Sequence, residues 1–174
     1  QPDLIEKTIG QVLEDQAVLY PDGEALVSIH QGIRWTYREF FDEVNTIARG
    51  LIGVGILPGD KVGIWSTNRV EWTVTQFATA MIGAVLVNIN PAYKISELEY
   101  ALNQSECRMI ILEKEFKSSK YYEMIKEVAP KVESLWYVVK LDEDESEIPW
   151  PTMEILSWED LKLAGKDVWD SFFA

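Results

Sequence analysis

Few side chains in this sequence have the type and spacing that catalysis usually requires. The chain has one histidine, His30, and one cysteine, Cys107. His30 stands beside an expected hairpin turn, so we interpret it as an exposed turn residue rather than a catalytic base, which argues against a serine or cysteine triad. The sequence has no Gly-x-Gly-x-x-Gly, no Gly-x-x-x-x-Gly-Lys-Ser/Thr loop and no Cys/His metal spacing. These patterns alone predict a domain of unknown activity.

Acidic side chains dominate the charge of the chain. Asp and Glu number 29 against 16 Lys and Arg, giving a net charge of −13 at pH 7. Such a chain repels phosphate backbones, so nucleic acid is not an expected partner. The densest acidic cluster, residues 142–151, also contains prolines, and we interpret it as an exposed, solvated loop rather than a hard-cation site. No metal ligand is predicted.

Aromatic residues fall on segments that are expected to be buried. Trp65, Trp72, Phe77 and Trp136 lie on apolar strands and a helix. We interpret them as core packing rather than as a cage for a ligand.

Apolar periodicity and turn residues predict alternating helices and strands. Capping boxes or caps begin helices near residues 8, 36, 68, 96, 119 and 157, and apolar runs predict strands at 25–29, 33–35, 61–65, 85–89, 108–112 and 135–139. The alternation indicates an α/β fold with a mostly parallel, doubly wound sheet, helices on both faces, and a short N-terminal β-hairpin. At 174 residues, the chain is long enough for one substantial core.

Membrane and export signals are not evident in the sequence. No apolar run approaches the ~20 residues that span a bilayer, and the first residues lack a basic and an apolar signal region. We therefore expect a cytoplasmic protein without a transmembrane segment.

Five segments, in order along the chain, resemble the acyl-CoA synthetase branch of the adenylate-forming (AMP-binding) enzyme superfamily. The first, Trp-Thr-Tyr-Arg-Glu-Phe from Trp35, resembles the family's Leu-Thr-Tyr-x-Glu-Leu core motif. The others are Gly-Asp-Lys-Val-Gly-Ile from Gly59, Asn-Arg-Val-Glu-Trp from Asn68, Ala-Met-Ile-Gly-Ala-Val-Leu-Val-Asn-Ile-Asn-Pro from Ala80, and Ser-Glu-Leu-Glu-Tyr-Ala-Leu-Asn-Gln-Ser from Ser96. Their order and spacing agree from about residue 9 to residue 165.

This resemblance implies that residues 1–174 belong to the large N-terminal domain of an ATP-dependent fatty acid–CoA ligase. Such enzymes use ATP, Mg²⁺ and CoA to form an acyl-adenylate and then an acyl-CoA thioester, and the Val-Asn-Ile-Asn-Pro-Ala-Tyr wording is similar to members that activate medium- or long-chain fatty acids. The sequence contains no Thr-Ser-Gly-Thr-Thr-Gly-x-Pro-Lys-Gly loop for the ATP phosphates. We therefore expect the isolated chain to be inactive and assign no catalytic residue to it.

The resemblance also implies two candidate contacts for CoA. The loop after the second-motif strand, which contains Asn90, Pro91, Ala92 and Tyr93, would line the path of the pantetheine arm. Lys117 and Lys120, after the next strand, would meet a CoA phosphate, for which a lysine ammonium is suited. Equally, Asn-Pro is common in turns, and two lysines before a helix are common on solvated surfaces.

Other functions remain open at this point. Within the family, the parent protein could be an aryl-CoA ligase or a peptide-synthetase adenylation domain. Outside it, the chain could be a non-catalytic α/β binding module or a scaffold. The apolar residues among 166–174 also make self-association an expectation.

Overall fold

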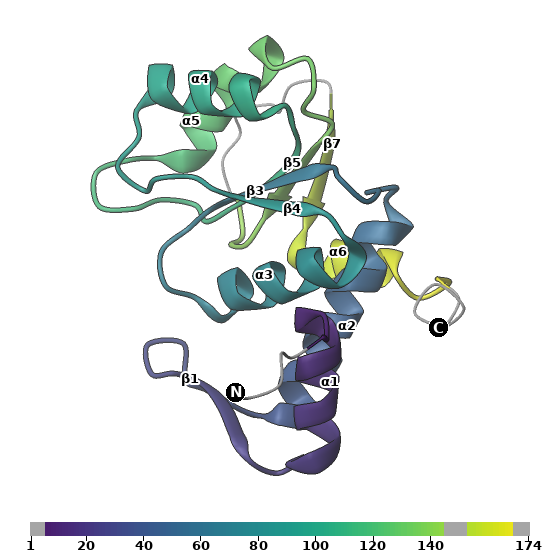
Figure 1. The fold of residues 1–174 in the computed structure, drawn as a ribbon. Coiled ribbons are helices and arrows are strands. Elements are labelled where there is room, and N and C mark those ends of the chain that lie inside the picture. The colour runs from purple at the N-terminus through teal and green to yellow at the C-terminus, as the bar shows by residue number, and fades with distance from the viewer. Residues whose placement is uncertain (1–5, 145–152, 169–174) are drawn as a thin grey trace, which may run out of the picture.

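A five-stranded sheet lies at the centre of the computed structural model, which describes residues 6–144 and 153–168 (Figure 1). Its strands run in the order β4-β3-β5-β6-β7, and every neighbouring pair is parallel. The strands are β3 (Lys61–Trp65), β4 (Val85–Asn88), β5 (Cys107–Leu112), β6 (Tyr137–Lys140) and β7 (Glu154–Ser157). The predicted parallel sheet is confirmed.

Helices cover both faces of this sheet, as predicted (Figure 1). One face carries α2 (Tyr37–Gly53), α3 (Val70–Ile82) and α6 (Trp158–Ala164), and the other carries α4 (Ile95–Ser105), α5 (Tyr121–Val128) and the short 3₁₀ helix η1 (Ala129–Lys131). Outside α2 and α3 lie α1 (Ile9–Leu19) and the antiparallel hairpin of β1 (Glu24–Ser28) and β2 (Ile33–Thr36).

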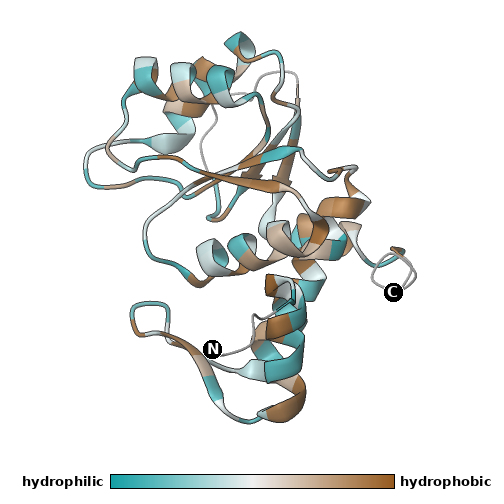
Figure 2. Ribbon diagram, in the orientation of Figure 1, coloured by the Kyte–Doolittle hydropathy of each residue, from teal (hydrophilic) through white to brown (hydrophobic). Residues whose placement is uncertain are grey.

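The apolar side chains of the strands alternate between the two faces. On β5, Met109 and Ile111 enter the core beneath α2 and α3, whereas Ile110 and Leu112 enter the core beneath α4 and α5. All four are fully buried. Figure 2 shows the resulting hydrophobic colouring along the central strands. A strand with both faces covered therefore needs a continuous apolar run, which is how it was recognised in the sequence.

Local side-chain caps fix the beginnings of α1, α2 and α6. The expected capping boxes at Thr8, Thr36 and Ser157 are present, and at α2 the Thr36 amide donates to a Glu39 carboxylate oxygen at 2.8 Å. The start of α3 was predicted from Asn68, but its cap is Arg69. There the Val70 amide donates to the Gln31 side chain of the hairpin at 2.8 Å, so a tertiary contact replaces a local cap.

Helices α2 and α6 approach so closely that their contact requires glycine. A Cβ atom built on Gly50 would lie 2.1 Å from the carbonyl oxygen of Leu161, and one on Gly53 would lie 2.0 Å from that of Ala164. No neighbouring side chain can rearrange to relieve such an overlap, because the atoms in contact belong to the backbone of α6. These two glycines therefore set the distance between the helices.

Candidate functional site

Three loops meet at the carboxyl ends of the sheet strands, where open parallel sheets bind their ligands. They follow β3, β4 and β5 and contribute residues 66–68, Pro91 and Phe116, respectively, to one pocket of about 570 Å³. We call this cavity the carboxyl-edge pocket. His30 of the hairpin and Trp72 of α3 also line it. His30 is exposed, as predicted, and its ring nitrogen lies 3.3 Å from the Ser28 hydroxyl.

The predicted 90–93 loop is held rigidly at the rim of this pocket. The Asn90 side-chain oxygen accepts from the Ala92 amide at 2.9 Å, and the Asn90 backbone carbonyl accepts from the Trp65 indole at 3.0 Å. The Tyr121 hydroxyl donates to the Pro91 carbonyl at 2.5 Å. These bonds fix the backbone of the loop from within and from the core beneath it.

Trp65 and Tyr121 form the buried platform under that loop. Their rings stack with centroids 3.6 Å apart, and both side chains are fully buried. Burial raises the pKa of the Tyr121 phenol, so it stays protonated and keeps donating. The prediction that Trp65 packs in the core is thus confirmed, and its indole N–H has the partner that a buried tryptophan needs.

Neither of the two predicted lysines lines the carboxyl-edge pocket. Lys117 adopts a left-handed backbone (φ 53°) and places its ammonium 5.1 Å from the ring centroid of Phe116, which lines the pocket. Lys120 caps α5, is exposed, and forms an ion pair with Glu115. Its hydrogen bond to Glu115 raises the pKa of the Lys120 ammonium.

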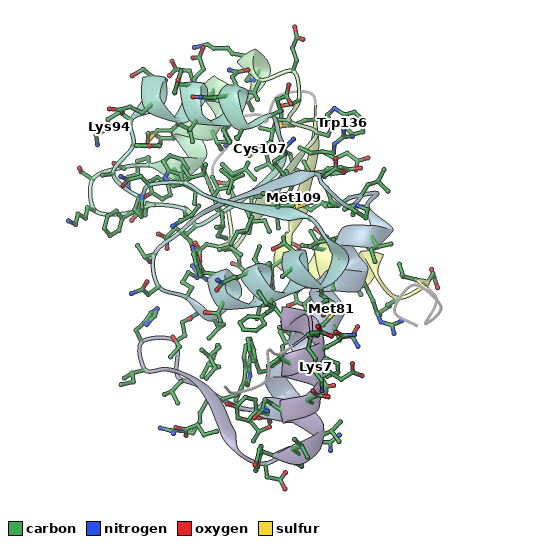
Figure 3. The ribbon with its side chains drawn as sticks, viewed as in Figure 1. Lys7, Met81, Lys94, Cys107, Met109 and Trp136 are labelled. Atoms are coloured by element: carbon green, nitrogen blue, oxygen red, sulfur yellow. The ribbon has the colours of Figure 1, made fainter. Side chains whose placement is uncertain are left out.

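Lys120 borders a second hollow of about 310 Å³ at the start of α5, which sequence reasoning missed. Lys94, the N-cap of α4, lines the same hollow and donates to the Ser119 hydroxyl at 2.9 Å. Figure 3 shows Lys94 and Trp136 at opposite ends of the sheet. The structure therefore places Pro91 at the carboxyl-edge pocket and Lys120 at the second hollow. Lys117 lies between these two residues in the sequence.

A cluster of charged side chains also lies at this edge, and none of them was assigned to a site from the sequence. Arg69 binds Glu71 at 3.1 Å and Asp142 at 2.7 Å, and Glu113 lies 4.0 Å from it. Burial opposes the charge of Arg69, but the hydrogen bonds to Glu71 and Asp142 outweigh it and raise the pKa of the guanidinium. Each of these residues follows a buried strand or begins a helix, which is the signal that could have identified them.

Comparison with known proteins agrees with this geometry. The family described as AMP-binding enzyme matches residues 13–166. This chain belongs to the AMP-binding enzyme family.

Individual relatives have more specific names than the family. The chain is 41% identical over 131 residues to the human (Homo sapiens) protein named "Medium-chain acyl-CoA ligase ACSF2, mitochondrial", and 42% identical over 130 residues to the Mus musculus protein of that name. Each match includes 75% of this chain and 21% of the relative. The chain therefore spans about a fifth of the length of the curated relatives that it matches.

Solved structures of ligases share the fold. Coronafacic acid ligase from Pectobacterium brasiliense superposes with a TM-score of 0.79 at 21% identity, covering 94% of this chain and 31% of that one. The anthranilate CoA ligase AuaEII, solved with anthranoyl-AMP, gives 0.78 at 24% identity, covering 92% and 29%. At these identities the likeness establishes the fold of this AMP-binding family chain.

One prediction about an individual side chain of this AMP-binding family member was wrong. Trp136 is 52% exposed rather than buried, because β6 begins only at Tyr137, and the guanidinium of Arg108 lies 3.8 Å over its ring. In the acidic stretch 142–151, which was expected to be solvated, Glu143 is exposed, whereas Asp142 binds Arg69, and Asp144, 3% exposed, pairs with Lys126 at 3.4 Å. Residues 145–151 lie outside the described part of the chain.

The described residues include neither a membrane-spanning helix nor a metal-binding group of side chains. Across residues 6–144 and 153–168, no helix has the length and apolar character needed to cross a membrane. In the same ranges, no group of three or more His, Cys, Asp or Glu side chains is arranged to hold a metal ion.

Proposed function

We propose that this chain is part of an ATP-dependent acid–thiol ligase that activates a medium- or long-chain fatty acid and transfers it to CoA. The observation that carries the proposal is the AMP-binding family match over residues 13–166, together with relatives at 41–42% identity that are named medium-chain acyl-CoA ligases. In the first step, the carboxylate of the acid would displace pyrophosphate from ATP to give an acyl-adenylate. In the second, the CoA thiol would attack the acyl carbon and release AMP.

The residues of this chain fit the CoA part of that reaction. The carboxyl-edge pocket has a rigid rim in the 90–93 loop, and two lysines follow at Lys117 and Lys120. Cationic side chains beside a cavity suit a ligand with a long neutral arm and phosphate groups at one end. We propose that the loop lines the pantetheine path and that the lysines meet a CoA phosphate.

We propose no ATP or Mg²⁺ contact for the residues of this chain. The sequence contains no glycine-rich Thr/Ser loop, and the described residues present no group of metal ligands. We therefore assign no adenylation step to this chain. We expect the isolated chain neither to exchange pyrophosphate into ATP nor to form acyl-CoA, and robust exchange by the purified chain would contradict this expectation.

Charge removal at the two lysines tests the CoA assignment. In the full-length enzyme that contains this sequence, we expect Lys117→Gln with Lys120→Gln to raise the KM for CoA about three- to tenfold, because exposed ion pairs contribute up to ~1 kcal/mol each. The effect is limited because Lys120 must exchange Glu115 for the phosphate. The KM for ATP should stay within about twofold of the wild-type value.

Lys131→Gln is the matched control for that double variant. Lys131 is also an exposed lysine with a carboxylate partner, Glu99 at 3.3 Å, but it lies in η1 beyond the far end of α5. The Lys131→Gln variant should have the same KM for CoA as the wild type. Unchanged CoA kinetics in the double variant would remove Lys117 and Lys120 from the site.

Cellular location and self-association remain predictions from the sequence. The relatives compared above carry the word mitochondrial in their names, whereas the sequence led us to expect a cytoplasmic protein. Microscopy of the tagged full-length protein distinguishes the two locations. Sedimentation of the purified protein tests the self-association expected from residues 166–174.

A further inference from the structure

One wall of the carboxyl-edge pocket, residues 66–68, is fastened to the end of β5 by a single carboxylate. One oxygen of Glu113 accepts from the Thr67 amide at 2.9 Å, and the other accepts from the Thr67 hydroxyl at 3.1 Å. The Glu113 amide donates to the Trp65 carbonyl at 3.3 Å, directly before this wall begins. Glu113 thus holds both the backbone and the side chain of Thr67, which faces the pocket.

This carboxylate is not required to neutralise the arginine beside it. Arg69 already donates to Glu71 and to Asp142, and its approach to Glu113, at 4.0 Å, is longer than either of those contacts. The Glu113 side chain is only 9% exposed, and burial raises the pKa of its carboxyl group. Removing the charge of Glu113 therefore leaves Arg69 with two partners and relieves a desolvation cost.

The hydrogen bonds to Thr67 have a consequence for a flexible ligand. A wall that is already ordered spares the complex the entropy cost of ordering it on binding. The pocket that it faces also contains Pro91 of the 90–93 loop on its rim. Loosening residues 66–68 would therefore weaken the binding of a ligand that lies between the two loops.

We propose that Glu113 is a positioning residue for CoA, acting through Thr67 to fix the wall along which the pantetheine arm lies. The proposal rests on the proposed function, because it takes CoA as the occupant of the carboxyl-edge pocket. Glu113 does not itself line that pocket, so its role is indirect.

Glu113→Gln and Thr67→Val in the full-length enzyme test this role. Thr67→Val removes the hydroxyl donor, and Glu113→Gln replaces one charged acceptor oxygen by an amide NH2 and so weakens the pair of bonds, while both variants keep the shape of the side chain. We expect either change to raise the KM for CoA about tenfold, which corresponds to about 1.4 kcal/mol, and to leave acid-dependent pyrophosphate exchange within about twofold. The double variant should be little worse than either single one, because the two changes remove one shared interaction.

A stability measurement separates positioning from general damage. Glu113→Gln is expected to unfold at the same urea concentration as the wild type or a higher one, even though its KM for CoA is expected to be raised. Glu43→Gln is the matched control, since Glu43 is 19% exposed and pairs with Lys162 at 3.0 Å on the opposite face of the sheet. This control should leave the KM for CoA unchanged.

Each remaining outcome counts against the proposal. An unchanged KM for CoA in both variants, or equal losses for CoA and for pyrophosphate exchange, would show that Glu113 has no selective role in CoA binding. If the wild-type enzyme forms no acyl-CoA from any fatty acid tested, the proposed function fails first, and this inference fails with it.

Discussion

Substitution of Gly50 by alanine offers a sharp test of the packing between α2 and α6. In an ordinary helix interior, this change stabilises by about 1 kcal/mol, because alanine loses less backbone entropy than glycine. Here the new Cβ would lie 2.1 Å from the Leu161 carbonyl oxygen, whereas ordinary contact begins near 3.4 Å, so the helices must separate by about 1.3 Å. Overpacking of this kind costs about 1–3 kcal/mol.

The backbone-to-backbone overlap places the cost at the upper end of that range. After the propensity gain, we expect Gly50→Ala to lower the free energy of unfolding by about 2 kcal/mol and the Tm by about 4–8 °C. Urea denaturation followed by tryptophan fluorescence measures the first quantity, and Trp158 on α6 reports on the helix that must move.

Gly10 supplies the control for this prediction within the same fold. It also lies in a helix, α1, but its added Cβ would meet Met81 at an ordinary distance of 3.5 Å. Gly10→Ala should therefore be neutral or stabilising by up to about 1 kcal/mol. The reasoning is refuted if Gly50→Ala is as stable as the wild type, or if both substitutions destabilise equally.

Three further predictions concern the carboxyl edge of the sheet. Arg69→Met leaves three carboxylates without their shared cation and should lower the free energy of unfolding by about 2–3 kcal/mol at pH 7, as measured by urea titration. Tyr121→Phe removes the donor to the Pro91 carbonyl and should cost about 1 kcal/mol by the same assay, and an unchanged midpoint would contradict that bond. The pKa of Glu113 is raised in the folded protein. The contribution of this carboxyl group to stability is therefore complete below its unfolded pKa of about 4.3 and is lost as the pH rises through the folded pKa. The stability of Glu113→Gln relative to the wild type should consequently increase from pH 4 to pH 8. A pH-independent difference would show that this carboxyl has no raised pKa.

Patterns within one element predicted most of the fold. The continuous apolar run of β5 and the capping box at Thr36 each depend on neighbours within a few residues, and both occur as expected. The strand β7 was missed because its four residues, Glu154–Ser157, follow an acidic, proline-containing stretch and carry only a short apolar core. Its pairing with β6 is a long-range contact that local sequence does not encode.

Residues that act across elements were the harder part of the site. The 90–93 loop was predicted from its resemblance to a family motif, but its support by Tyr121 joins residues 30 positions apart. Glu113 and Thr67 are 46 positions apart and resemble ordinary loop residues in the sequence. A carboxylate directly after a buried strand is a usable signal only once the sheet order places that strand beside its neighbour.

Charged side chains lie at both ends of the sheet. At the amino end, Arg108 binds Asp60 at 3.3 Å and lies over the half-exposed Trp136, and such surface pairs contribute about 1 kcal/mol or less. At the carboxyl end, burial raises the pKa of Glu113, so the ionised form of this carboxyl group costs stability. A buried charge that lowers stability is accounted for by what it holds, and Glu113 holds Thr67 at a pocket.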